Sequence, residues 1–214
     1  MNPQTATIFI VDDDPSVQDG LSLLVRSAGW TCEVFASAED FLARPAWTGI
    51  GCLILDVCMP GTSGLELRDA LAARDASLPI VFLTGHGDVP MGVDAMRKGA
   101  VDFLQKPVND EVLLQAIRQA VERHAAAVAR QQEVARIQAG LEQLSPRERQ
   151  VLEYVINGCL NKHIAANLGI AERTVKIFRS NVMRKLEVDS VAALVRKCDL
   201  AGVVPRQVGA TSPS

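Results

Sequence analysis

Reactive side chains follow four short hydrophobic segments in the first half of the chain, and together they include acids, a hydroxyl and an ammonium group. The segments 7–11, 52–55, 80–83 and 101–105 are followed, in that order, by three acids (Asp12, Asp13, Asp14), one acid (Asp56), a hydroxyl (Thr84) and an ammonium group (Lys106). In an open parallel sheet such strand ends gather at one edge, where ligands bind. Carboxylates, a hydroxyl and a lysine at that edge could hold a divalent cation and a phosphoryl group.

Phosphoryl transfer is the chemistry that this set of residues would support. Mg²⁺ prefers oxygen ligands, and a cation would relieve the repulsion among Asp12, Asp13 and Asp56. An aspartate can attack phosphorus and become an acyl phosphate. Lys106 and Thr84 would then offset charge on the phosphoryl oxygens. A single strand-end aspartate is more often a helix cap, so the prediction depends on all five residues occurring together.

Strand-like and helix-like segments alternate through the first half. Strands are predicted at 7–11, 31–35, 52–55, 80–84 and 101–105, and amphipathic helices near 15–28, 38–46, 64–74 and 89–98. Hydrophobic strands that alternate with helices form a parallel sheet with helices on both faces. Five such strands predict a flavodoxin-like, doubly wound α/β fold.

A long segment without helix breakers follows. From Asp110 to about Leu141 the chain has no proline and a single glycine, and Asn109 can serve as the N-cap. About 30 residues make a helix of roughly 45 Å, and only its first half can pack on the sheet. We expect the second half to link two domains or to pair with another copy of the chain. A solvated linker helix fits the pattern equally well.

The second half predicts a small all-α domain. Ser145, Pro146 and Glu148 form a capping-box pattern. Helices are expected at about 146–157, 161–168, 172–186 and 190–200. Helices with such short connections indicate a four-helix bundle.

The helix expected at 172–186 is basic and follows a glycine turn. Gly169 stands where the preceding helix must end. Hydrophobic residues at helical spacing predict one buried face, with Lys176, Arg179 and Ser180 on the opposite face. A helix-turn-helix with these two faces suits the major groove of double-stranded DNA. A solvated basic helix is the alternative that charge alone leaves open.

Composition is that of a folded protein with two unlike halves. Hydrophobic residues make up 48% of the chain, and no hydrophobic run approaches the roughly 18 residues of a membrane span. The start of the chain lacks the pattern of a secretion signal, so we expect a cytoplasmic protein without a membrane partner. Residues 1–123 hold 9 Lys and Arg against 17 Asp and Glu, whereas residues 124–214 hold 13 against 8. The five scattered cysteines are expected to be reduced packing residues.

The first half resembles the receiver domains of two-component response regulators. VDDDPSV, LILDVCMPGTSGLEL, IVFLTGHGD and GAVDFLQKP carry this resemblance, which covers about residues 5–123. It implies that a sensor histidine kinase phosphorylates Asp56. It also implies that Asp13, Asp56 and the backbone carbonyl of Cys58 bind Mg²⁺, with Asp12 assisting partly through water.

The same resemblance implies how the domain changes state. Thr84 and Phe103 would act as a switch pair, and Lys106 would bind the phosphoryl group. The Lys106–Pro107 bond is expected to be a cis peptide, an isomer largely confined to proline.

The second half resembles the LuxR/FixJ-type DNA-binding domain over about residues 144–203. The matching segment is LSPRERQVLEYVINGCLNKHIAANLGIAERTVKIFRSNVMRKLEV. The resemblance implies that Lys176, Ile177 and Ser180 face DNA bases. The candidate phosphate contacts are Lys162, Thr174, Arg179 and Lys185.

Both halves depart from the family patterns at a few positions. Val108 stands where phenylalanine is usual, and Cys58 and His86 flank the acidic site at positions that tune acyl-phosphate lifetime. Leu160 and Ala171 stand where the DNA-binding family often has a capping serine or threonine. Each missing cap would cost about 1 kcal/mol of stability.

These patterns together predict a DNA-binding response regulator of the FixJ/NarL type. The domains are a receiver at 1–123, a helical linker at 124–143 that continues the last receiver helix, a DNA-binding domain at 144–204 and a disordered tail at 205–214. Phosphorylation would shift a two-state equilibrium and favour homodimers on paired DNA half-sites, with RNA polymerase as a further candidate partner.

The resemblance implies no enzyme activity beyond self-catalysed phosphorylation and dephosphorylation. Two alternatives stay open. A haloacid-dehalogenase-type phosphohydrolase would need a second aspartate where Cys58 stands. A constitutive DNA-binding protein would carry a receiver that no longer accepts a phosphoryl group.

Overall fold

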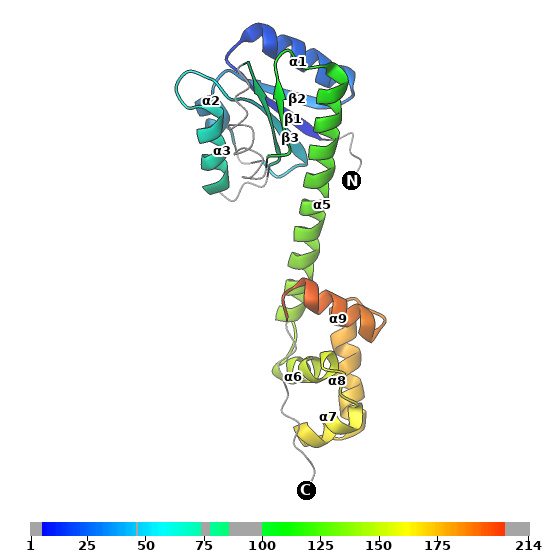
Figure 1. The fold of residues 1–214 in the computed structure, drawn as a ribbon. Helices are drawn as coiled ribbons and strands as arrows, with labels where there is room; N and C mark the ends of the chain where they lie inside the picture. Colours follow the sequence, from blue (N-terminus) through cyan, green and yellow to red (C-terminus); the bar gives the residue numbers. More distant parts are fainter. Residues whose placement is uncertain (1–5, 46, 74–77, 86–99, 204–214) are drawn as a thin grey trace. The chain divides into compact units, whose positions relative to one another are not determined.

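Five parallel strands form one sheet in the first part of the chain (Figure 1). Their order is β2-β1-β3-β4-β5. The strands are β1 (Thr7–Val11), β2 (Thr31–Phe35), β3 (Gly51–Asp56), β4 (Ile80–Thr84) and β5 (Asp102–Gln105). The interior strands β3 and β4 are buried at every residue, which explains their unbroken hydrophobic sequences. The predicted flavodoxin-like sheet is confirmed.

The computed structural model describes residues 6–45, 47–73, 78–85 and 100–203. The chain divides into two units, residues 1–129 and residues 130–214. This division falls inside the predicted linker, and the predicted bounds of the receiver, linker and DNA-binding domain stay predictions. The predicted helix at 89–98 and the predicted tail at 205–214 lie outside the described residues.

Helices cover both faces of the sheet in the first unit. One face packs against α1 (Pro15–Ser27) and the first half of α5 (Asp110–Glu142), and the other packs against α2 (Ala38–Ala43) and α3 (Gly64–Ala73). Successive residues of a strand enter opposite cores. In β1, for example, Ile8 and Ile10 join the core beneath α1 and α5, whereas Phe9 joins the core beneath α2 and α3.

Helix α5 runs without a break, as its sequence predicts. Asn109 is its N-cap, because Asn109 Oδ1 accepts hydrogen bonds from the N–H groups of Glu111 (2.9 Å) and Val112 (3.3 Å). The first half of the helix contributes hydrophobic side chains to the core of the first unit, and its last turns contribute to the core of the second.

The second unit is all helical in its described residues. Besides the end of α5 it contains α6 (Pro146–Ile156), α7 (Asn161–Leu168), α8 (Glu172–Lys185) and α9 (Val191–Leu200). The capping box of Ser145 and Glu148 is present. Gly169 ends α7 with φ of 65°, in the left-handed region that glycine favours. Neither Leu160 nor Ala171 caps its helix through a side chain, as predicted.

The composition of the chain led to predictions about membrane-spanning segments and about the cysteines. No helix among them has both the length and the hydrophobic character needed to cross a membrane. All five cysteines are free thiols. Cys52 and Cys198 are buried in hydrophobic cores, as expected of packing residues, whereas Cys58 is exposed.

Candidate functional site

Three aspartates meet at the carboxyl ends of β1 and β3. One carboxylate oxygen from each of Asp12, Asp13 and Asp56 lies within 4.8 Å of the other two. The two strands are hydrogen-bonded neighbours in matching register, so their ends coincide. Asp12 and Asp56 are buried, at 1% and 6% exposed, whereas Asp13 is exposed. Asp14 has another use, because its Oδ1 caps α1 by accepting the N–H of Ser16 (2.8 Å).

Lys106 reaches this cluster from the end of β5. Its Nζ lies 2.6 Å from Oδ2 of Asp12 and 3.2 Å from Oδ2 of Asp56. Burial raises the pKa of Asp56, although the nearby Lys106 opposes that rise. Burial alone would lower the pKa of Lys106, but its contacts with Asp12 and Asp56 raise it above the ordinary value. The site therefore contains three acids and one lysine, and the raised pKa of Lys106 keeps this lysine protonated at neutral pH.

Thr84 and Phe103 lie on the same face of neighbouring strands. The register of β4 and β5 places Phe82 beside Phe103, and Thr84 shares the face of Phe82 because it lies two residues further along the strand. Thr84 is fully buried, and its carbonyl accepts the N–H of Lys106 (2.8 Å). The rings of Phe82 and Phe103 have centroids 6.2 Å apart. The Lys106–Pro107 peptide is cis, as expected.

The segment after Asp56 carries Cys58 on the surface. The N–H of Cys58 donates to Oδ1 of Asp56 over 3.4 Å. The segment ends at Gly64, whose N–H donates to the carbonyl of Val57 (3.1 Å). A Cβ at Gly64 would lie 2.1 Å from the carbonyl oxygen of Asp56, so a larger residue would not fit. His86, the other residue predicted to flank the site, lies outside the described residues.

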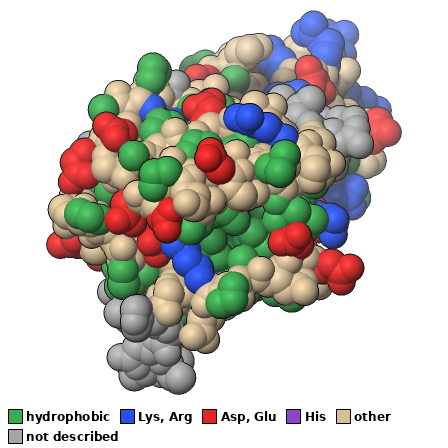
Figure 2. Space-filling model, turned by 90° about the horizontal axis from the view of Figure 1, so that it is seen from above, with side chains coloured by type: hydrophobic (Ala, Val, Ile, Leu, Met, Phe, Trp, Pro, Cys, Tyr) green, Lys and Arg blue, Asp and Glu red, His purple; other side chains and the backbone are tan. Residues whose placement is uncertain are grey.

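A hydrophobic cavity lies beside Lys106. It has a volume of about 770 Å³ and lies between α1 and the loop that joins β5 to α5. Val108 and Leu23 line it, and the Leu23 side chain is 73% exposed. Figure 2 shows one face of the molecule, on which hydrophobic side chains gather with acidic and basic side chains around them.

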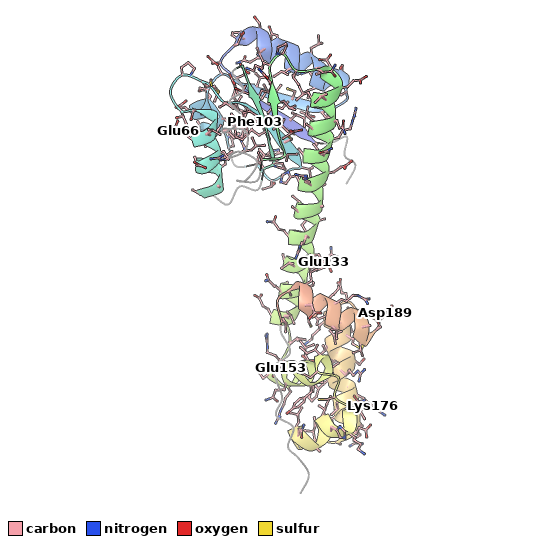
Figure 3. All side chains as sticks on the ribbon, viewed as in Figure 1. Glu66, Phe103, Glu133, Glu153, Lys176 and Asp189 are labelled. Atoms are coloured by element: carbon pink, nitrogen blue, oxygen red, sulfur yellow. The ribbon has the colours of Figure 1, made fainter. Side chains whose placement is uncertain are left out.

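Helix α8 has the two faces that its sequence predicts. Val175 and Val182 are buried in the core of the second unit. Lys176, Ile177 and Ser180 are exposed, and Ile177 keeps 59% of its surface accessible. Lys176 projects outward from the helix (Figure 3). A hydrophobic side chain this exposed, beside a lysine and a serine, suits contact with base edges in a groove.

The candidate phosphate contacts differ in their surroundings. Lys162 is exposed in the first turn of α7, and Thr174 is half-buried in the first turn of α8. Arg179 is also half-buried, and its Nη1 donates to Oδ1 of Asn161 (3.0 Å). This bond joins the two helices of the helix-turn-helix.

Lys185, the fourth candidate, forms an ion pair that the sequence pattern did not reveal. Its Nζ lies 2.6 Å from Oε2 of Glu148, which is 4% exposed, and 2.9 Å from the carbonyl of Gln143. The hydrogen bonds from Lys185 and from the N–H of Ser145 lower the pKa of Glu148 to about 2. The capping-box pattern marks Glu148 in the sequence but does not show that this side chain is buried. Since Glu148 is buried in the folded unit, its carboxylate requires a cationic partner.

Two protein-family models match the chain. Residues 8–118 match the response regulator receiver domain. Residues 142–198 match the bacterial regulatory proteins of the luxR family. The two matches fall on the two units that carry the acidic cluster and the basic helix.

Relatives of known name match almost the whole chain. The response regulator protein TmoT of Ectopseudomonas mendocina is 46% identical over 92% of this chain and 89% of its own length. The transcriptional regulatory protein FixJ of Azorhizobium caulinodans is 44% identical over 95% and 96%.

Solved structures extend the similarity to the fold. The response regulator StyR is 46% identical, covers 91% of this chain and 98% of its own, and superposes with a TM-score of 0.83. Full-length FixJ from B. japonicum is 41% identical, covers 93% and 98%, and has a TM-score of 0.57. The chain therefore belongs to the two-component response regulators of the FixJ type, with a receiver domain followed by a LuxR-type DNA-binding domain.

Proposed function

We propose that Asp56 is the phosphoacceptor of this response regulator and that its phosphorylation controls DNA binding by the second unit. The observation that supports this most strongly is the gathering of Asp12, Asp13, Asp56 and Lys106 at one end of the sheet. Three acids beside a single lysine leave an excess of negative charge that serves no packing purpose. Such an excess suits a site that takes up a cation and a phosphoryl group.

The chemical step is a transfer from a phosphohistidine of a sensor kinase or from a small phosphodonor. One carboxylate oxygen of Asp56 forms a bond to phosphorus while the bond from phosphorus to the donor breaks. The electron pair of that bond stays on the donor. The Lys106 ammonium then faces the phosphoryl oxygens, and the buried Thr84 on the adjacent strand offers its hydroxyl to the same group.

The donor set fits Mg²⁺ because it consists of oxygen atoms. Asp12, Asp13, Asp56 and the carbonyl of Cys58 would hold the ion, and the carboxylates already lie close to one another. When bound, the ion would supply positive charge to the phosphoryl oxygens.

Thr84 and Phe103 are the proposed switch. Their common face on β4 and β5 supports this role, because a displacement of Thr84 towards the phosphoryl group would open space beside Phe103. Phosphorylation would then favour homodimers on paired half-sites, and a bound dimer could contact RNA polymerase. Sedimentation of the protein with and without phosphodonor would test the dimer.

DNA contact is proposed for the exposed side chains of the helix-turn-helix. Lys176, Ile177 and Ser180 would contact bases, and Lys162 and Thr174 would contact phosphates. Arg179 and Lys185 each carry a bond within the protein. We therefore expect Lys162 to contribute more to phosphate binding than Arg179 or Lys185.

The apolar cavity next to Lys106 supports a protein as the physiological donor. A kinase helix that buries exposed Leu23 would bring its phosphohistidine to the edge where Lys106 meets Asp56. Phosphotransfer from a panel of purified histidine kinases would identify the donor. Leu23→Glu should then slow transfer from that kinase while leaving labelling by a small phosphodonor unchanged.

Labelling of the protein by acetyl phosphate and Mg²⁺ tests the proposed acceptor. Intact-mass measurement should detect one phosphoryl group on the wild type and on the control Asp19→Asn, which changes an exposed acid of α1. Asp56→Asn should take up none. Labelling of Asp56→Asn would exclude the proposed acceptor, and steady release of phosphate from p-nitrophenyl phosphate would favour the phosphohydrolase alternative.

A further inference from the structure

The segment that joins β3 to α3, residues 57–63, is tied to a different helix at Thr62. Oε1 of Glu39, in the first turn of α2, accepts hydrogen bonds from the N–H (3.2 Å) and the hydroxyl (2.5 Å) of Thr62. Bonds to an ionised carboxylate are shorter and stronger than bonds between neutral groups. The hydroxyl of Thr62 lowers the pKa of Glu39, so the carboxylate that accepts these bonds is ionised at neutral pH.

The backbone of this segment also runs close to the Glu39 carboxylate. Gly61 has φ of 77°, and a Cβ there would lie 3.3 Å from Oε1 of Glu39. Beyond Thr62 the segment is fixed by Glu66 of α3 (Figure 3), whose Oε2 accepts the N–H (2.8 Å) and the hydroxyl (2.7 Å) of Ser63. Glu39 and Glu66 therefore hold the segment from two helices.

The near end of the same segment adjoins the acidic cluster. Cys58 is two residues after Asp56, and its N–H contacts the Asp56 carboxylate. Any shift of the segment at Thr62 would be transmitted over the three intervening residues to the Cys58 carbonyl. Glu39 itself is exposed on α2 and does not belong to the acidic cluster.

We propose that Glu39 is a positioning residue for the metal site. Its hydrogen bonds with Thr62 fix the segment that carries the Cys58 carbonyl, and the position of this carbonyl in turn sets the affinity for Mg²⁺. This inference rests on the proposed function, which takes that carbonyl as a ligand. Groups that orient metal ligands typically change affinity by about 10- to 100-fold. Because Glu39 acts from an exposed position, we expect about the lower of these values.

Titration calorimetry of Mg²⁺ into the unphosphorylated full chain tests this role. Glu39→Ala, which removes both bonds, should raise the Kd about tenfold. Thr62→Val, which keeps the N–H bond, should raise it by a smaller factor, and the double variant should be no weaker than Glu39→Ala. Thr62→Ser, which keeps the hydroxyl, should bind as the wild type does. Asp40→Ala is the matched control, because Asp40 is an exposed acid in the same helical turn. The Tm without Mg²⁺ should be nearly the same for the wild type and all five variants.

The outcomes separate the inference from the function on which it rests. Failure of the wild type to bind Mg²⁺ would overturn the proposed metal site and the role of Glu39 together. Binding by the wild type with an unchanged Kd in Thr62→Val and Glu39→Ala would overturn the positioning role alone. An equal loss of affinity in Asp40→Ala would also overturn it, because the effect would then be one of charge. If Glu39→Ala is poorly folded, the Kd values of Thr62→Val and Thr62→Ser for Mg²⁺ test the inference on their own.

Discussion

Each unit of this protein contains a half-buried lysine that pairs with a buried carboxylate at an N–O distance of 2.6 Å, and the surroundings of the two pairs differ. In the second unit, Lys185 faces one acid, Glu148, which also accepts the N–H of Ser145. In the first unit, Lys106 faces Asp12 and Asp56, with Asp13 close by. The pair in the second unit is balanced in charge, whereas the site in the first unit is left with an excess of acids.

The pKa values of the acids reflect this difference. Hydrogen bonds from Lys185 and Ser145 lower the pKa of Glu148 to about 2, which is the behaviour of a structural ion pair. Burial raises the pKa of Asp56 in spite of Lys106, which is the behaviour of a group whose charge the fold does not fully compensate. A buried charge is costly unless it is paired. The charge imbalance, rather than burial or distance, is what distinguishes the proposed phosphorylation site from the ion pair of the second unit.

Removal of the functional lysine should have the largest effect. Lys106→Met should slow labelling by acetyl phosphate by about 100-fold, because one positive charge facing the phosphoryl oxygens is lost. Lys185→Met is the matched control and should be labelled at the wild-type rate. Initial rates from intact-mass measurements provide the comparison, and equal rates for both variants would remove the distinction between the two pairs.

Removal of the structural lysine should instead weaken the second unit. Lys185→Met leaves Glu148 buried without its cation, and breaking one side of such a pair costs about 3 kcal/mol. Hydrogen exchange of α6 and α8 measures this loss. Lys176→Met, on the exposed face of α8, should change the stability by less than about 0.5 kcal/mol. If the Lys185 variant kept wild-type protection, the pair would not hold α8 on α6.

Acid should break the same pair without a mutation. The pKa of Glu148 is lowered on folding, from an ordinary value near 4.5 to about 2. Its contribution to stability is therefore complete above about pH 4.5 and is lost as the pH falls towards 2. The loss should reach about 3 kcal/mol. Hydrogen exchange in α6 should show it, and Glu148→Gln should flatten this part of the profile. If Glu148→Gln showed the same pH dependence of hydrogen exchange as the wild type, the acid-induced loss of stability would not come from Glu148.

The first unit should respond to acid at a higher pH and more weakly. His124 is buried, and its Nδ1 lies 3.0 Å from the backbone nitrogen of Gly51, whose N–H it can accept when neutral, and 3.1 Å from the Gly51 carbonyl oxygen. Burial lowers the pKa of His124 below its ordinary value of 6.5. Its contribution is therefore complete above about pH 6.5 and is lost as the pH falls from there through the lowered pKa of the folded state. Unfolding followed by the fluorescence of Trp30 and Trp47 should show a loss that is absent in His124→Gln. If both units lost stability over the same pH range, their responses to acid would not be independent.

Much of this fold and site follows from local sequence patterns. The strands are continuous hydrophobic runs, so their ends could be placed, and with them Asp56, Thr84 and Lys106. The capping box at Ser145 and the glycine end of α7 also follow from neighbouring residues alone. These features depend on spacing along the chain, which the sequence contains directly.

The contacts that could not be predicted join residues far apart in sequence. Lys185 and Glu148 are 37 residues apart and Glu39 and Thr62 are 23 apart. Their meeting depends on how helices cross, which no local pattern specifies. The family resemblance makes Lys185 a candidate DNA-phosphate contact, and in the folded unit it also contacts Glu148 and the Gln143 carbonyl.

We propose above all that the phosphoryl group on Asp56 controls DNA binding by the same chain. The most direct test is the affinity of the full chain for a DNA fragment selected with phosphodonor-treated protein, measured by fluorescence anisotropy with and without acetyl phosphate and Mg²⁺. Wild type and Asp19→Asn should bind about tenfold more tightly after treatment, a coupling typical of two-state regulators. Asp56→Asn should not respond. Equal affinities of treated wild type and treated Asp56→Asn would contradict the account.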